Sequence, residues 1–385
     1  MAEKFKCPKC GNEDEKYIGY LNGKPYCRFC ISMNGKSAEK PWKKNGSVVL
    51  KLDYALSKEQ DELSQKILEN YKAGIDTLVN AVCGAGKTEL VYRVISYCLS
   101  QNKTVGFAVP RRDVVVELSL RIKDAFPSNY VVSVYGGHTD KLEGDVIVLT
   151  THQFYRFEKY FDLLILDEID AFPFKDNELL NRMFLRAKRG NIVMMSATPP
   201  ESAIEYFSKE NREILELNTR FHRHPLPVPT VIKKIGYLKF GYLISKLKKF
   251  VTEKKKVFIF APTVSRCEFV FNVICRVVKN GNYVHSKCKN RAEIISDFKN
   301  GKYDYLVTTA VLERGVTFKN LQVIIFDADN EIYTSAALIQ IAGRVGRKYD
   351  APNGEVIFLV NKETVEIKNA IKEIKRKNES LQSVF

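Results

Sequence analysis

The segment Ala81-Val-Cys-Gly-Ala-Gly-Lys-Thr88 decides the fold, because it joins an apolar run to an amphipathic stretch. This order predicts a strand, a tight turn and a helix. Successive backbone N–H groups of such a turn, together with the helix N-terminus, form a cradle for phosphate groups. Lys87 would reach the β- and γ-phosphates of a nucleotide, and Thr88 would hold Mg²⁺ through its hydroxyl. Ala81 stands where the simplest pattern has glycine, so the segment alone also permits a glycine-rich turn without a ligand.

The segment Leu163-Leu-Ile-Leu-Asp-Glu-Ile-Asp170 is a second apolar run, and it ends in carboxylates. Asp167, at the carboxyl end of the expected strand, is placed to hold Mg²⁺ through water. Glu168 is the natural base to orient and deprotonate the attacking water. A solvated acidic turn has a similar composition, but it does not usually follow a phosphate-binding turn in a repeating α/β pattern. The two segments together predict ATP hydrolysis.

Short apolar runs alternate with amphipathic stretches along most of the chain, which predicts buried parallel strands joined by crossover helices. The expected strands lie at 77–82, 105–109, 146–149, 163–166, 192–195, 257–260, 305–308, 323–326 and 356–360. The clearest helices are expected at 265–280 and 335–343, and a solvated helix at 362–377. The proline-rich segment 219–229 has no period and is the expected interdomain linker. We therefore expect an α/β fold with two parallel-sheet units, at 50–217 and 230–385, after a small module at 1–45.

Four of the nine cysteines lie in the first 30 residues, as Cys7-x2-Cys10 and Cys27-x2-Cys30. This spacing is typical of a tetrahedral zinc site in which each pair presents two thiolates to one ion. Two disulfides or a redox pair are the alternatives, but a reducing compartment disfavours disulfides, and a redox pair needs only one such motif. A site closed by four thiolates has no open position for catalysis, so we expect structural Zn²⁺ that folds the module at 1–45.

The composition is that of a globular protein, with 45% hydrophobic and 28% charged residues in a chain of 385. No run approaches the length of about 20 apolar residues that a membrane helix needs, and the N-terminus lacks a signal core. A cytoplasmic location is therefore expected. Lys and Arg outnumber Asp and Glu by 61 to 45, a net charge of +16. That surplus favours a polyanionic partner such as nucleic acid, although an ordinary lysine-rich surface is equally compatible with it.

The segment Gln340-Ile-Ala-Gly-Arg-Val-Gly-Arg347 places two arginines three residues apart, near one another on a helix face or turn. Guanidinium groups delivered from a second domain can stabilise negative charge on a transferring γ-phosphoryl group. We therefore expect Arg344 and Arg347 to act in ATP hydrolysis; a basic surface helix is the alternative.

Over about residues 55–350 the chain resembles the superfamily 2 helicases. The matching segments are 81–88 with motif I, 109–113 with motif Ia, 167–170 with motif II, 196–198 with motif III, 258–262 with motif IV, 308–317 with motif V and 340–347 with motif VI. The resemblance implies two RecA-like domains that close on ATP. The residues it implies around the nucleotide are Gln60, which reads the adenine edge, and Gly84, Ala85, Gly86, Lys87, Thr88 and Glu89.

The same resemblance implies two further groups of residues. Those that couple hydrolysis to movement are Ser196, Ala197, Thr198, Gly315 and Gln340. Those that contact a nucleic-acid backbone are Pro110, Arg111, Arg112, Thr151, His152, Thr308 and Thr309. Contacts of this kind are independent of base sequence and sensitive to salt.

Within the superfamily the chain most resembles the ComFA late competence proteins. The cues are the N-terminal cysteine module, Asp167-Glu-Ile-Asp-Ala-Phe-Pro173 and Leu312-Glu-Arg-Gly-Val-Thr-Phe318. This resemblance implies an ATPase dependent on single-stranded DNA that works in natural transformation at the inner face of the cytoplasmic membrane, attached through its partners. It would draw the incoming strand through the ComEC channel and act with ComFC, and a homo-oligomer is left open.

Three alternatives remain at this point. Replication-restart helicases resembling PriA have a similar motif I but are much longer and carry their zinc cysteines between helicase segments. DEAD-box RNA helicases have Pro-Thr-Arg-Glu where this chain has Pro110-Arg-Arg-Asp113, and His where it has Gln340. A zinc-ribbon binding protein with a decayed ATPase conflicts with the presence of Lys87, Asp167 and both arginines of the 340–347 segment.

Overall fold

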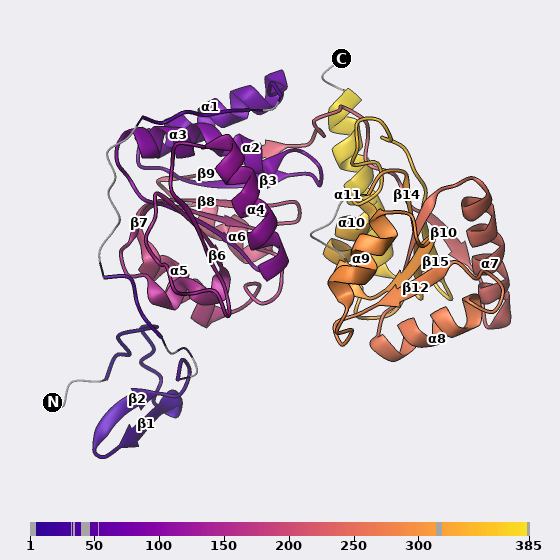
Figure 1. Cartoon of the computed structure of the whole chain (residues 1–385), viewed down its shortest axis with the longest axis horizontal. Coiled ribbons are helices and arrows are strands. Elements are labelled where there is room, and N and C mark those ends of the chain that lie inside the picture. Colours follow the sequence, from indigo (N-terminus) through magenta and orange to yellow (C-terminus); the bar gives the residue numbers. More distant parts are fainter. Residues whose placement is uncertain are drawn as a thin grey trace. The chain divides into compact units, whose positions relative to one another are not determined.

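The computed structural model of the protein describes residues 5–31, 33, 35–39, 47–52, 54–312 and 318–382. The chain forms two compact units. The first consists of Met1–Ala81 and Gly86–Leu217, and the second of Val82–Ala85 and Asn218–Phe385. Each contains one parallel sheet (Figure 1). Among the described residues, no helix has both the length and the apolar character needed to cross a membrane.

A small antiparallel hairpin carries the N-terminal cysteines. It consists of β1 (Ile18–Leu21) and β2 (Lys24–Cys27), after the 3-10 turn η1 (Glu15–Tyr17). Asn22 and Gly23 both have positive φ, as a two-residue hairpin turn requires. The four buried cysteines form the core of the hairpin and belong to the same apolar cluster as the first sheet.

The first unit has a seven-stranded parallel sheet in the order β5-β6-β4-β7-β8-β3-β9. Its strands are β3 (Asp76–Ala81), β4 (Val105–Val109), β5 (Val131–Val134), β6 (Val146–Thr150), β7 (Phe161–Asp167), β8 (Lys188–Ser196) and β9 (Arg212–Leu217). Its helices are α1 (Lys58–Lys72), α2 (Lys87–Leu90), α3 (Tyr92–Ser100), α4 (Arg112–Ala125), α5 (Glu178–Ala187) and α6 (Glu201–Phe207), with the 3-10 turn η2 (Thr151–Arg156). Right-handed crossovers place α3 and α4 on one face of the sheet and α5 and α6 on the other.

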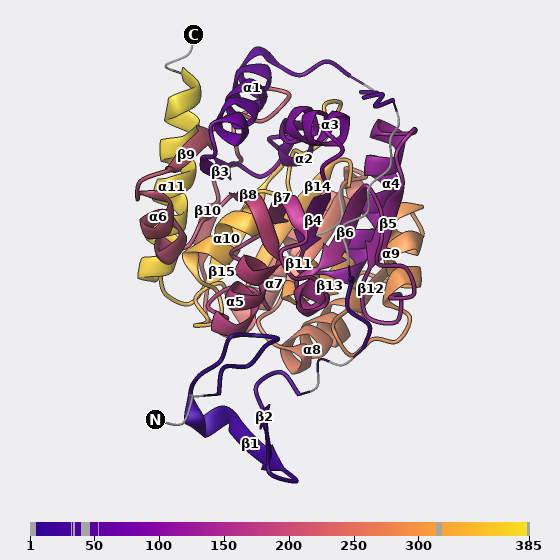
Figure 2. The same cartoon turned by 90° about the vertical axis from the view of Figure 1, so that its left-hand side faces the viewer.

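The second unit has a six-stranded parallel sheet in the order β10-β15-β14-β11-β13-β12. Its strands are β10 (Thr230–Lys233), β11 (Lys256–Phe260), β12 (Gly281–Val284), β13 (Tyr305–Thr308), β14 (Leu321–Phe326) and β15 (Val356–Val360). Its helices are α7 (Tyr237–Thr252), α8 (Val264–Ile274), α9 (Arg291–Lys299), α10 (Ser335–Ala342) and α11 (Val365–Gln382), with the 3-10 turn η3 (Ala310–Leu312). Helices α7 and α8 pack on one face, and α9 and α10 cover the other (Figure 1). The strands of the first sheet can be followed in their order across Figure 2.

The predicted α/β fold with two parallel sheets is confirmed, and each of the nine expected strands is present. Four strands of the two parallel sheets were not expected, namely β5, β9, β10 and β12, and neither were the two hairpin strands β1 and β2. Helix α8 ends at Ile274, well before residue 280. The expectation of a solvated C-terminal helix was wrong in one respect, because Ile367, Ala370 and Ile374 of α11 are buried and α11 packs on α10.

The proline-rich segment 219–229 follows the boundary between the two units and is held by contacts within the second. Arg220, His222 and Leu226 are buried. The backbone N–H of Leu226 donates to the side chain of Asn378 on α11, and the Asn378 amide donates back to the Leu226 carbonyl. This segment is therefore a structural part of the second unit as well as a connection.

Candidate ATP, nucleic-acid and metal sites

The segment expected to bind phosphate follows β3 and leads into α2, as the sequence predicts. Gly84 and Gly86 have φ of 87° and 75°, a region that L-residues with a Cβ avoid. A Cβ at Gly86 would also lie 2.6 Å from Nε2 of Gln60. Lys87 directs its ammonium back to the carbonyl oxygen of Ala81 at 3.5 Å, and Thr88 begins the buried part of α2. The turn therefore has the strand-turn-helix form that a phosphate cradle requires.

Two residues expected beside the nucleotide have partners inside the first unit. Gln60 is buried at the third position of α1, where its side-chain oxygen accepts from the N–H of Ser57 at 2.9 Å and completes a capping box. Glu89 is buried, and its carboxylate accepts from Arg121 of α4 at 2.6 Å. Gln60 thus lies against the cradle, whereas Glu89 ties α2 to α4.

Asp167 ends β7 and Glu168 follows it, and the carboxyl end of β7 lies on the same sheet edge as that of β3. Asp167 accepts from the backbone N–H of Glu168 at 2.8 Å. Burial raises the pKa of Asp167 to about 6. The positive charge of nearby Lys87 acts to lower this pKa, and the negative charge of Glu168 acts to raise it. Glu168 has φ of 58°, a left-handed conformation that is uncommon for a non-glycine residue and recurs at active sites. The Asp167 carboxylate and the Thr88 hydroxyl are oxygen donors of the kind Mg²⁺ prefers.

The pairing of Asp170 was not anticipated. Its carboxylate accepts from the hydroxyls of Ser196 and Thr198, each at 2.7 Å. Ser196 ends β8, and Ala197 is buried between the two hydroxyl residues. Asp170 therefore connects the carboxylate segment after β7 to the segment expected to couple hydrolysis to movement. The signal in the sequence is its place three residues after Asp167, which was quoted only as part of motif II.

The residues expected to contact nucleic acid in the first unit lie beyond the carboxyl ends of β4 and β6. Pro110 is buried, Arg111 is partly exposed at the residue before α4, and Arg112 is exposed at the start of α4. Thr151 is fully buried in η2, and His152 is exposed beside it. This is the edge at which parallel α/β sheets generally bind ligands.

An aromatic stack at this edge was not expected from the sequence. The Arg112 guanidinium lies 4.8 Å from the centre of the Tyr135 ring, which stacks on His138 at 5.0 Å. Tyr135 and His138 exchange backbone hydrogen bonds across Gly136 and Gly137. The stack combines a cation with planar rings, which is the composition of surfaces that bind single strands.

In the second unit, Arg344 and Arg347 follow α10 in a turn whose backbone is held by side chains of the 219–229 segment. Arg344 is 1% exposed, and Arg347 donates from Nε to the Gly343 carbonyl at 3.0 Å. Arg220 donates to the carbonyl oxygens of Gly343, Val345 and Gly346 at 3.1, 2.9 and 2.9 Å. Burial and the neighbouring Arg347 lower the pKa of Arg220 to about 10, which still leaves it charged at neutral pH. The sequence contained no pattern that singled out Arg220.

Three other expected residues of the second unit fall in different settings. Thr308 is fully buried and its hydroxyl donates to the Val284 carbonyl at 2.8 Å, so its side chain supports the sheet instead of facing a strand. Thr309 is partly exposed just beyond β13. Gln340 is buried on α10. Gly315 lies outside the described residues.

The four N-terminal cysteines converge as the spacing predicts. Their sulfur atoms all lie within 4.8 Å of one another, with Cys7 and Cys30 at 3.6 Å and Cys10 and Cys27 at 3.7 Å. A tetrahedron with Zn–S arms of about 2.3 Å has edges of about 3.8 Å, so the sulfur positions fit Zn²⁺. These distances are far longer than the bond of about 2.05 Å in a disulfide.

Comparison with known proteins places the two sheets in recognised families. Residues 53–201 match the family model of the type III restriction enzyme res subunit, and residues 239–349 match the helicase conserved C-terminal domain. The competence protein ComFA of Bacillus subtilis (strain 168) is 35% identical, over 98% of this chain and 86% of that protein. ComFA of Streptococcus pneumoniae (strain ATCC BAA-255 / R6) is 32% identical, over 97% of this chain and 90% of that protein.

A structural comparison gives the same fold. The structure of S. cerevisiae Dbp5 bound to RNA and ADP BeF3 matches 84% of this chain and 92% of its own, with a TM-score of 0.61 at 16% identity. At that identity the match shows the fold alone.

The fold and the sequence matches thus define a superfamily 2 helicase with two RecA-like domains, a class whose domains imply ATPase activity. Within that class the chain belongs to the ComFA family of competence proteins. The family match extends over nearly the whole chain. The PriA-like and DEAD-box alternatives are therefore set aside.

Proposed function

We propose that the protein is an ATP-driven translocase on single-stranded DNA that acts in DNA uptake during competence. The observation that carries the ATPase step is the convergence of Lys87, Asp167 and Asp170 at the carboxyl edge of one sheet. Membership of the competence family supports DNA as the polymer. The net charge of +16 supports a polyanionic partner.

For hydrolysis, we assign Lys87 and the backbone from Gly84 to Gly86 to the phosphates. Thr88 and Asp167 would hold Mg²⁺, whose charge neutralises the phosphate oxygens when it is bound. Glu168 orients and deprotonates the attacking water, because its carboxylate follows directly after the metal-binding carboxylate. Arg344 and Arg347 supply positive charge for the transferring phosphoryl group from the second domain. Gln60 provides the amide that reads the adenine.

The proposal also assigns residues that couple ATP hydrolysis to movement and residues that contact the DNA strand. The hydrogen bonds of Asp170 with Ser196 and Thr198 support a role in transmitting the state of the nucleotide to the strand-binding edge. We assign backbone contacts to Arg111, Arg112, His152 and Thr309, which are exposed or partly exposed at carboxyl edges. Because Thr308 is buried, its assignment changes from contact to support. We assign strand contact to the main-chain atoms of Thr151 and Pro110. Gly315 and Gln340 would couple hydrolysis to movement.

The module at 1–45 binds structural Zn²⁺ in this proposal, and the RecA-like domains span 50–217 and 230–385. The remaining elements come from the family resemblance: attachment at the inner face of the cytoplasmic membrane, ComEC and ComFC as partners, and a homo-oligomer.

ATPase measurements with different polymers test the proposal. We expect single-stranded DNA to raise the rate more than duplex DNA or RNA of equal length. Stimulation by RNA alone would contradict the proposal, as would a rate that no nucleic acid changes.

A further inference from the structure

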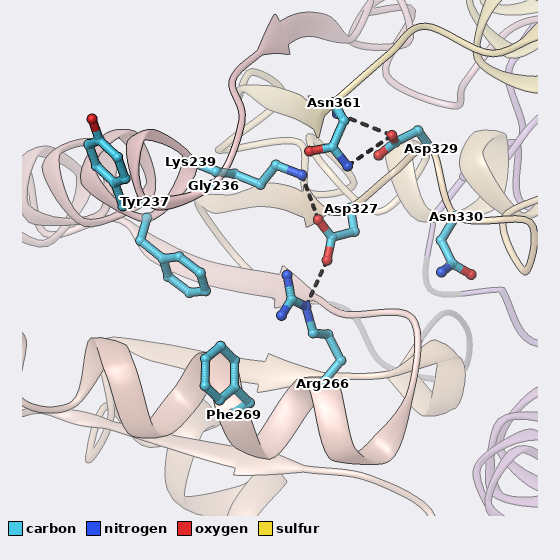
Figure 3. Close-up of a pocket in the computed structure, with 10 residues that line it drawn as sticks. Gly236, Tyr237, Lys239, Arg266, Phe269, Asp327, Asp329, Asn330 and Asn361 are labelled. Carbon is cyan, nitrogen blue, oxygen red and sulfur yellow. Dashed lines mark hydrogen bonds and ion pairs between the residues drawn. The ribbon is translucent and has the colours of Figure 1, made fainter.

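The second unit contains a pocket of about 650 Å³ at the carboxyl ends of its strands (Figure 3). Tyr237 is the first residue of α7, which follows β10, and Arg266 lies in the first turn of α8, which follows β11. Asp327 and Asn361 directly follow β14 and β15. Ligands of parallel α/β sheets bind at this edge. The volume is in the range of pockets that hold small molecules, roughly 300–1,000 Å³.

Asp327 organises the cationic side of the pocket. One of its oxygens accepts from Lys239, which is 3% exposed, at 2.6 Å, and the other accepts from Nε of Arg266 at 2.7 Å. Among the described residues, the two terminal nitrogens of Arg266 have no hydrogen-bond acceptor. The guanidinium also lies within 5.9 Å of the ring centres of Phe240, Phe269 and Phe326. Arg266 is thus held in place by Nε and the rings, while its terminal donors are unused.

Asp329 provides the complementary group. Its Oδ2 accepts from the backbone and the amide of Asn361 at 3.1 and 3.2 Å, which fixes the carboxylate at the end of β15. Its Oδ1 is buried and has no hydrogen-bond partner in the described part of the chain. A buried acceptor without a donor is costly, and such an atom calls for an explanation. A ligand with an N–H group would satisfy it.

The charged residues that line the pocket indicate which class of ligand fits it. Lys239 and Arg266 are balanced by Asp327 and Asp329, so a phosphate group would meet two carboxylates as well as two cations. An uncharged planar heterocycle with donors and acceptors at its edge satisfies both the Arg266 nitrogens and Asp329 Oδ1. Aromatic carbon is available at the pocket from Phe269, which is 49% exposed. These are the properties of a nucleobase.

We propose that this pocket holds one unstacked nucleobase of the single strand on which the protein acts. This inference rests on the proposed function and adds to it, because backbone contacts alone give no base-dependent affinity. Arg266 donates to the base edge, Asp329 Oδ1 accepts from it, and Phe269 contacts its face. The contact tolerates different bases, since each base has a π face and most have both donors and acceptors.

Binding of two single strands to the full-length protein tests the inference. One strand carries ordinary bases, and the other has the same length and phosphates but abasic sites in its interior. We expect Arg266→Met to weaken binding of the ordinary strand by about tenfold, the size of one base contact, and to leave the abasic strand unaffected. Arg276→Met is the matched control, because Arg276 is exposed beyond the other end of α8 and loses the same charge.

Tyr237→Ala provides a second variant that cannot fail through misfolding, because Tyr237 is 84% exposed at the pocket. We expect a smaller loss, again confined to the ordinary strand. Equal weakening of both strands with a shallower salt dependence would identify a phosphate contact and overturn the inference. Unchanged binding of both strands by Arg266→Met would overturn it too. In either case, ATPase stimulation of the wild type by single-stranded DNA would leave the proposed function standing.

Discussion

Arg220 and Gly346 are joined by a hydrogen bond in which Nη1 of the buried guanidinium donates to the carbonyl oxygen at 2.9 Å. The same guanidinium binds the carbonyls of Gly343 and Val345, so it holds the turn between Arg344 and Arg347 from the inside. Gly346 has φ of 69°, and a Cβ there would lie 2.1 Å from the Pro352 carbonyl oxygen. The positions of both arginines therefore depend on a residue more than a hundred positions earlier in the chain.

Arg220→Lys is expected to lower the ATPase rate by about 100-fold, because an ammonium cannot bind three carbonyls at once and the two arginines lose their alignment. Stability should fall as well, by about 2 kcal/mol, since carbonyls are left without donors. Steady-state kinetics and urea unfolding measure the two effects. Arg223→Lys, at an exposed position three residues away, is the control. A normal rate in Arg220→Lys would show that the turn does not need this support.

His222 should make the second unit less stable in acid. Burial lowers the pKa of His222 from its ordinary value of 6.5. The neutral ring fits its contacts, because Nε2 donates to the Gly346 carbonyl at 2.8 Å and Nδ1 accepts from the N–H of His224 at 3.1 Å. Below pH 6.5 the unfolded chain binds a proton that the folded chain resists, so stability falls as the pH decreases.

Urea unfolding at about pH 8 and about pH 5.5, on either side of the ordinary histidine pKa, tests this effect of His222. The wild type is expected to lose more stability over this interval than His222→Gln, which has no titrating ring. His138→Gln, at an exposed position, should behave like the wild type. Identical pH dependence in wild type and His222→Gln would contradict the assignment.

Asp170→Asn is expected to reduce stimulation of the ATPase by single-stranded DNA by about tenfold, a common size for coupling between two sites. The amide has one acceptor oxygen in place of two, so the hydrogen bonds with Ser196 and Thr198 cannot both persist as they are. The ratio of stimulated to basal rate is the measurement. Asp176→Asn removes an exposed carboxylate nearby and should leave the ratio unchanged. An unchanged ratio in Asp170→Asn would remove this residue from the coupling path.

One zinc ion per chain is expected, and Cys10→Ser should abolish it. Burial raises the pKa of the Cys10 thiol to about 12, so four thiolates in this cluster require a bound cation. Without the ion, the β1–β2 hairpin should lose its structure and become sensitive to protease. Atomic absorption and limited proteolysis report the two changes. Cys275→Ser, which alters a cysteine of the second unit, should retain the metal. Retention of zinc by Cys10→Ser would argue against a four-thiolate site.

The sequence was most informative where structure depends on neighbouring residues. Buried parallel strands are continuous apolar runs, so strands such as β4 and β15 were predicted with their observed limits. Strands β10 and β12 were missed because they are four-residue edge strands with mixed polarity. The phosphate cradle and the Asp167–Glu168 pair are contiguous and could be predicted.

Partners that are distant in the chain could not be predicted. Asp170 meets Ser196 only because β7 and β8 are adjacent in the sheet. Arg220 meets Gly346 across 126 residues. The pocket around Arg266 draws residues from four strand ends, and no local pattern unites them.

The claim that this protein is a motor on single-stranded DNA is tested most directly by displacement of streptavidin from the end of a biotinylated single strand. The wild type should displace it from one end in an ATP-dependent reaction, and Lys87→Ala should not. The end from which displacement occurs reports the direction of movement. If the wild type hydrolyses ATP on the strand but never displaces streptavidin, or if Lys87→Ala displaces it equally well, the protein is not an ATP-driven translocase.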